Sequence, residues 1–84
     1  MRFDVALFEL RLFKSRSQAG LAIQDGSALL NGEIVKPSHG VRPGDRVTVV
    51  GSLAARTYEI LDLPSASVSR EAARALLREL SESE

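Results

Sequence analysis

The chain has 84 residues, 44% of them hydrophobic, and equal numbers of basic and acidic side chains give it a formal net charge of zero. A chain of this length forms one small domain that buries only about 60–65% of its unfolded surface, which leaves little room for a deep catalytic cavity. The absence of cysteine excludes disulfides, cysteine-containing zinc sites and thiol catalysis.

The amino-terminal segment does not resemble an export signal, because Asp4, Glu9 and Arg11 interrupt its apolar residues. No run approaches the roughly 20 apolar residues that a membrane span needs. We therefore expect a soluble, cytoplasmic protein without a membrane partner.

The charges are unevenly distributed along the chain. Residues 1–56 carry eight basic and five acidic side chains, whereas residues 57–84 carry three basic and six acidic ones. Such asymmetry is typical of a polyanion-binding body with an acidic tail, and it also arises by chance in short chains.

The first two predicted elements are helices. A stripe of apolar residues at helical spacing predicts a helix over residues 3–13. Ser15 and Gln18 have the spacing of a capping box and predict a second helix from Ser15 to about Asp25, stopped by Gly26. The connection is so short that the two helices must pack against each other at an angle.

After residue 27 the pattern changes to strands and turns. Asn31 and Gly32 lie between two short apolar runs and predict a hairpin with a type I′ turn. The Pro-Gly pair at 43–44 predicts a type II turn, and residues 46–50 then alternate as a half-buried strand does. A further strand is predicted over residues 56–63.

A last helix is predicted over residues 67–80, capped by Ser67 or Ser69, with an apolar stripe that must bury against the sheet or a second copy of the chain. We thus expect an α+β fold with two short packed helices, a small, mostly antiparallel sheet of about four to five strands, and a C-terminal helix. The expected division is 1–63 for the main domain and 64–84 for the helix with its acidic tail.

The chain shows no catalytic or metal-binding pattern. Its single histidine, His39, lies in a loop between turn signals, and Asp45 is explained as a turn residue that bonds its own backbone. No nucleophile–base pair and no metal-ligand spacing is visible. We expect no enzyme, no cofactor and no small-molecule substrate.

Residues 13–20, FKSRSQAG, place basic and hydroxyl side chains at the start of the second predicted helix. A helix N-terminus carries free N–H groups and partial positive charge, so it attracts anions. Lys14 and Arg16 flank this terminus, and Ser15 and Ser17 add donors. A capping box with solvated basic neighbours explains the same residues, so both interpretations stay open at this point.

Further polar residues could extend such a site into one basic face. Arg11 lies one turn back on the first helix, and Arg2 lies at its start. Lys36 and Ser38 repeat the pairing of a basic residue with a hydroxyl. Each of these residues alone is more typical of a solvated surface than of a ligand contact.

Six short motifs follow one another between residues 2 and 49 in an order and spacing known from one family. The matching residues are Arg2, Asp4 and Leu7; Arg11, Lys14, Ser15, Arg16 and Ser17; Gly26; Asn31 and Gly32; Lys36, Pro37 and Ser38; and Gly44 and Asp45. This segment resembles the S4 RNA-binding domain, also called the alpha-L motif. Within that family it is most similar to stand-alone bacterial proteins like the ribosome-associated heat-shock protein fifteen.

The resemblance implies a non-catalytic module of translation that binds structured RNA, ribosomal RNA in particular, through the helix pair and the following hairpin. The RNA contacts that it implies are Arg2, Arg11, Lys14, Ser15, Arg16, Ser17, Lys36 and Ser38. Because Phe3 and Phe13 belong to the predicted core stripe, we expect little base stacking. Two alternatives remain: a protein-interaction module, with a weak homodimer through the last helix, and an RNA-docking subunit of a separate RNA-modifying enzyme.

Overall fold

The computed structural model describes residues 1–51, 53–64 and 69–80. Ser67, the alternative helix cap, and the acidic tail at 81–84 lie outside the described residues. The elements within them are α1 (Phe3–Glu9), α2 (Arg16–Gln24), β1 (Ala28–Leu30), β2 (Arg46–Val50), β3 (Ala55–Ile60), α3 (Arg70–Ala75) and β4 (Leu77–Leu80).

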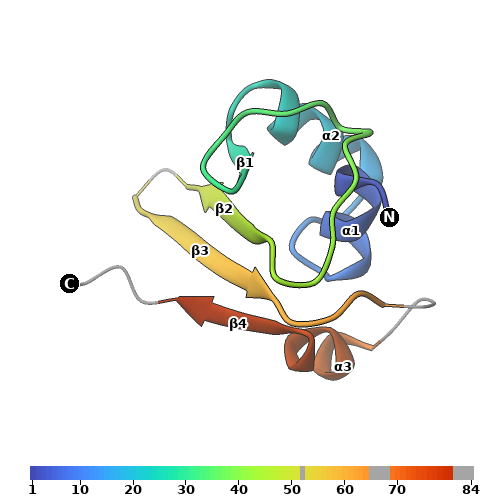
Figure 1. The fold of residues 1–84 in the computed structure, drawn as a ribbon. Coiled ribbons are helices and arrows are strands. Elements are labelled where there is room, and N and C mark those ends of the chain that lie inside the picture. Colours follow the sequence, from blue (N-terminus) through green and yellow to red (C-terminus); the bar gives the residue numbers. More distant parts are fainter. Residues whose placement is uncertain (52, 65–68, 81–84) are drawn as a thin grey trace.

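The strands of the described part form one antiparallel sheet in the order β1-β2-β3-β4, so each strand pairs with the one before it in sequence. Helices α1 and α2 lie together over one side of this sheet, and α3 lies beside the start of β4 (Figure 1). The predicted α+β class with a small antiparallel sheet is confirmed.

Helix α1 is shorter than predicted, because a Schellman motif ends it at Glu9. Arg11 takes the left-handed conformation with φ 66°, and its N–H donates to the Phe8 carbonyl at 3.0 Å. The Leu12 N–H reaches back to the Leu7 carbonyl at 3.0 Å. These two bonds satisfy carbonyls at the helix end and turn the chain, although the apolar spacing continues beyond it. The prediction of a helix through residue 13 is therefore wrong.

Helix α2 has the predicted boundaries. The Ser15 backbone is extended, and its Oγ accepts a hydrogen bond from the Gln18 N–H at 3.1 Å. At the other end Gly26 adopts φ 84°, and the Ser27 N–H donates to the Ala22 carbonyl at 2.8 Å. Glycine accepts this left-handed conformation at lower cost than other residues, which explains the stop.

The Asn31-Gly32 turn forms as predicted, with both residues at positive φ (52° and 83°) and backbone bonds in both directions between Leu30 and Glu33. It matches type I′, but the pairing stops after this single bridge. The described structure has no second hairpin strand after this turn, so that part of the hairpin prediction is wrong.

Beyond this single bridge, the chain after the turn does not pair with β1 and packs beside α1 instead. Strand β1 pairs with β2, which places Leu30 opposite the buried Val47. The following loop instead runs beside the start of α1, where the Phe3 N–H donates to the His39 carbonyl at 2.8 Å and the Asp4 N–H donates to the Pro37 carbonyl at 3.1 Å. Lys36 and Ser38 therefore lie on a loop next to α1.

The turn at 43–44 has the predicted type II geometry, since Gly44 has φ 98° and the Asp45 N–H donates to the Arg42 carbonyl at 3.1 Å. The Asp45 carboxylate accepts from the Arg42 N–H at 2.9 Å and from the Asn31 side-chain amide at 3.3 Å. The Asn31 carbonyl oxygen accepts from the Arg46 N–H at 2.9 Å. These bonds join the two turns, so Asp45 has the turn role expected of it.

The last segment departs most from the prediction. Ser69 caps α3 by accepting from the Ala72 N–H at 3.2 Å, but the helix ends at Ala75 and residues 77–80 form β4. Pairing with β4 satisfies the edge of β3, which would otherwise present open backbone groups. The helix predicted over residues 76–80 is wrong because this long-range pairing overrides local helical spacing.

The core lies between the helix pair and the inner face of the sheet. Its fully buried large side chains come from α1 and its C-cap, from α2, from the loop before β2 and from the sheet, and they are Phe3, Leu7, Leu10, Ile23, Val41, Val47 and Ile60. The helix pair is thereby fixed to the sheet, which holds the start of α2 at the surface.

Candidate nucleic-acid interface

The N-terminus of α2 combines free backbone donors with exposed cations. The Ser15 Oγ accepts a hydrogen bond from the Gln18 N–H, whereas helix geometry leaves the N–H groups of Arg16 and Ser17 without intrahelical acceptors. Lys14 and Arg16, on either side of the cap, are exposed. One serine thus starts the helix and sets its positive end between two basic side chains.

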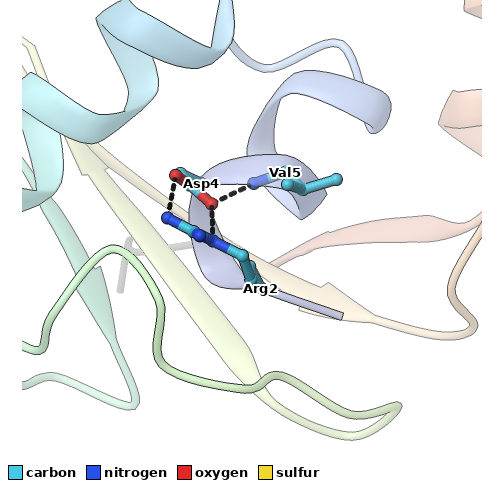
Figure 2. Close-up of polar contacts among 3 residues, drawn as sticks. All are labelled: Arg2, Asp4 and Val5. Atoms are coloured by element: carbon cyan, nitrogen blue, oxygen red, sulfur yellow. Dashed lines mark hydrogen bonds and ion pairs between the residues drawn. The ribbon is translucent and has the colours of Figure 1, made fainter.

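Arg2 is held beside this terminus by Asp4. The Arg2 Nε donates to Asp4 Oδ1 at 3.1 Å and its Nη2 donates to Oδ2 at 3.0 Å, as Figure 2 shows. Asp4 is largely buried and also accepts from the Val5 N–H at 2.7 Å. This bidentate pair fixes the guanidinium, and its remaining N–H groups stay available to a ligand, since the Arg2 side chain is 53% exposed.

A shallow hollow in the surface joins Arg2 to α2. It is lined by Arg2, Asp4, Arg16, Ser17, Gly20, Leu21, Gln24 and Pro37. Sequence reasoning missed the contribution of Gly20 and Gln24, although Arg16, Gly20 and Gln24 have the i, i+4, i+8 spacing of one helix face. A Cβ built on Gly20 would meet nothing within 4 Å, so this side of α2 is open.

The other predicted site residues lie outside this hollow. Arg11 and Lys14 line a separate groove, between the end of α1 and strands β3 and β4. Lys36 and Ser38 are exposed on either side of Pro37 and line neither depression. The predicted basic face is therefore divided by the α1–α2 connection rather than gathered around one point.

Two carboxylates away from the hollow have perturbed acidity. The pKa of Asp25 is lowered because the Ser27 hydroxyl and the Ser27 backbone N–H donate to its carboxylate. The pKa of Glu59 is lowered chiefly because Arg78 donates to it at 2.5 Å. Both groups stabilise the fold, at the end of α2 and between β3 and β4.

Residues 1–51, 53–64 and 69–80 include no cluster of three or more His, Asp or Glu side chains that could hold a metal ion. None of their helices is long and apolar enough to cross a membrane. His39 is exposed on its loop, and its carbonyl supports α1.

The fold and the hollow define a small α+β domain whose second helix presents a capped, basic N-terminus. The chain belongs to the S4 domain family, whose model matches residues 1–47.

Among curated proteins, the small ribosomal subunit protein uS4 of Gloeobacter violaceus is 39% identical over 80 residues, which cover 90% of this chain. The match spans only 39% of that relative's length.

Two solved structures share the whole fold. The trimeric structure of Vibrio cholerae heat shock protein 15 superposes with a TM-score of 0.89 at 28% identity, covering 98% of this chain and 83% of that one. The solution structure of the hypothetical protein HP1423 superposes with a TM-score of 0.81 at 27% identity, covering 99% of this chain and 100% of that one.

Proposed function

We propose that this protein is a non-catalytic RNA-binding module that recognises structured RNA, ribosomal RNA in particular, and acts with ribosomes in the cytoplasm. The observation that carries the proposal is the capped start of α2, flanked by exposed Lys14 and Arg16, in a member of the S4 domain family. The similarity to a ribosomal protein of the small subunit supports the choice of ribosomal RNA.

Recognition would rest on phosphates rather than on base edges. A-form RNA hides its major groove, so a protein reads its shape, its phosphates and its 2′-hydroxyls. The N–H groups of Arg16 and Ser17 would donate to one phosphate, and the guanidinium groups of Arg2 and Arg16 would neutralise that phosphate and its neighbours. The Gln24 amide, two turns along α2, would reach a sugar or a further phosphate.

Salt dependence tests this proposal directly. If about four to six phosphates are contacted, the slope of log K against log salt should be about −3 to −5. Filter binding of a ribosomal RNA fragment over a range of potassium chloride concentrations measures the slope. A slope near zero, or no binding at low salt, would contradict phosphate recognition.

Self-association is a second candidate, because the similar heat shock protein 15 structure is trimeric. The route first expected for it, a leucine-striped helix, is absent, since residues 77–80 form a strand and Leu76 and Leu77 pack against the core. Light scattering of the full chain, with and without RNA, distinguishes assembly alone from assembly on RNA.

A further inference from the structure

A groove separates the end of α1 from the inner face of β3 and β4. Its walls come from α1, the α1–α2 connection and α3, and its floor comes from the sheet; the lining residues are Phe8, Leu10, Arg11, Leu12, Phe13, Lys14, Arg56, Tyr58, Arg74, Leu77 and Glu79. The phosphate site proposed at α2 uses only the edge of this groove, at Lys14.

The groove exists because α1 is short. The register places Tyr58 opposite Val47 on one side and Glu79 on the other, so all three side chains share one face of the sheet. Val47 is fully buried under the helices. Since the Schellman motif ends α1 at Glu9, the helix layer does not extend over Tyr58 and Glu79, and this part of the inner face stays accessible.

Aromatic side chains gather in the groove. The chain has three phenylalanines and one tyrosine. Phe3 is fully buried, whereas the other three, Phe8, Phe13 and Tyr58, are partly exposed and line the groove. The expectation that Phe13 serves only the core is incomplete, because this side chain packs against the core and also faces the groove.

The charge of the groove is strongly positive. Four cationic side chains line it (Arg11, Lys14, Arg56 and Arg74), against one carboxylate, Glu79. Arg56 Nη1 lies 3.9 Å from Glu79 Oε2, and both side chains are more than half exposed, so this ion pair is weakened by solvent. The excess of cations in a protein of zero net charge indicates an anionic ligand.

We infer that this groove binds an unpaired, single-stranded stretch of RNA next to the structured element held at α2; the inference rests on the proposed function. Partly exposed aromatic rings together with arginines are the surface on which unstacked bases lie, while cations follow the backbone. A base-paired helix offers no free base face to these rings. Glu79 can accept hydrogen bonds from an exocyclic amino group of such a base.

The groove adjoins the proposed phosphate site, and this supports RNA as its occupant. Lys14 lines the groove, and the next residue, Ser15, caps the helix at which the phosphate site begins. An RNA strand that leaves the N-terminus of α2 therefore meets Lys14 first and the aromatic residues next. An acidic peptide would satisfy the cations, but it would leave the aromatic rings without stacking partners.

The test compares one RNA hairpin with and without a single-stranded extension that carries a fluorescent adenine analogue. In the wild-type chain the extension should increase affinity about tenfold and quench the analogue by stacking. Arg74→Glu and Tyr58→Leu should each abolish most of that gain and leave binding of the plain hairpin nearly unchanged. Arg42→Glu is the matched charge control, because Arg42 is exposed and lines neither depression.

The outcomes distinguish a failure of the groove inference from a failure of the proposed function. If the plain hairpin binds with the predicted salt slope but the extension adds neither affinity nor quenching, the groove inference is wrong and the proposed function stands. If neither RNA binds, both fail. If Arg74→Glu changes the oligomeric state in light scattering without changing the extension's contribution, the groove seats a second copy of the chain instead. Melting temperatures confirm that each variant is folded.

Discussion

Lys14 and Arg16 are separated by one residue, yet they line different depressions in the surface. Ser15, between them, is extended and caps α2, so the chain changes direction at that residue. The short connection between α1 and α2 thus serves two neighbouring surfaces, one along α2 and one toward the sheet.

Two substitutions of Ser15 distinguish its role as the cap of α2 from its role in the proposed anion site. Ser15→Asp should keep the cap, because aspartate caps helices as well as serine does and suits the helix dipole, so the melting temperature should not fall. The added negative charge should nevertheless weaken RNA binding about tenfold, because it occupies the position of the phosphate. Ser15→Ala should instead cost about 1 kcal/mol of stability through loss of the cap. Chemical denaturation and filter binding measure the two effects, and unchanged RNA affinity of Ser15→Asp would argue against the anion site.

Reversing the charge of Arg16 should weaken binding of structured RNA by about tenfold or more, because a phosphate contact is replaced by repulsion. The side chain is exposed, so the melting temperature should change little. Arg42→Glu, with the same charge change outside both depressions, should have a much smaller effect in the same assay. Equal affinity of Arg16→Glu and the wild type would remove Arg16 from the site.

Arg11 carries a conformational cost that glycine would relieve. Its φ of 66° costs an L-residue about 1 kcal/mol, whereas glycine adopts it freely. Arg11→Gly should therefore be about 1 kcal/mol more stable than Arg11→Ala, since both variants lose the same side chain. Both should lose affinity for RNA with a single-stranded extension to the same extent, because Arg11 lines the groove. Urea denaturation of the pair tests the backbone effect, and equal stability of the two would contradict it.

Acid should weaken the link between β3 and β4. The pKa of Glu59 is lowered in the folded protein by its hydrogen bond from Arg78. The contribution of this carboxylate to stability is therefore complete above its pKa in the unfolded chain, and it is lost as pH falls through its lower pKa in the folded protein. The window lies at and below about pH 4.3, the ordinary value for glutamate. Thermal melts should show a smaller acid-induced decrease for Glu59→Gln than for the wild type, and parallel pH profiles would exclude this link as a cause.

The acidic end of the chain should oppose RNA binding. Residues 81–84 add two glutamates to a half of the sequence that already has an acidic excess. Their removal should raise RNA affinity at low salt and have little effect at high salt, where the repulsion is screened. Filter binding of the truncated and full chains at two salt concentrations measures this, and identical curves at low salt would reject it.

Local signals were sufficient for much of the fold. The cap at Ser15, the stop at Gly26 and the two turns at 31–32 and 43–44 are formed by residues adjacent in sequence, and all four appear as predicted. The end of α1 could not be predicted in this way, because its left-handed residue is Arg11 rather than glycine. Nor could β4, whose residues have helical spacing and become a strand only because β3 offers an open edge.

Local sequence signals were likewise insufficient for the part of the candidate site that depends on residues distant in the chain. Motif order placed basic residues near the start of α2, and the hollow contains Arg2, Arg16 and Ser17. The sequence did not reveal that Arg11 and Lys14 face a second depression, because Arg56, Tyr58 and Arg74, which complete it, are more than forty residues away in the chain.

The sequential order of the strands bears on how the chain folds. Because each strand pairs with its predecessor, the sheet needs no crossover connection. During synthesis the helix pair and β1–β2 would be able to form before α3 and β4 have emerged, so the proposed phosphate site along α2 would be complete while the groove beside it still lacks one wall and part of its floor.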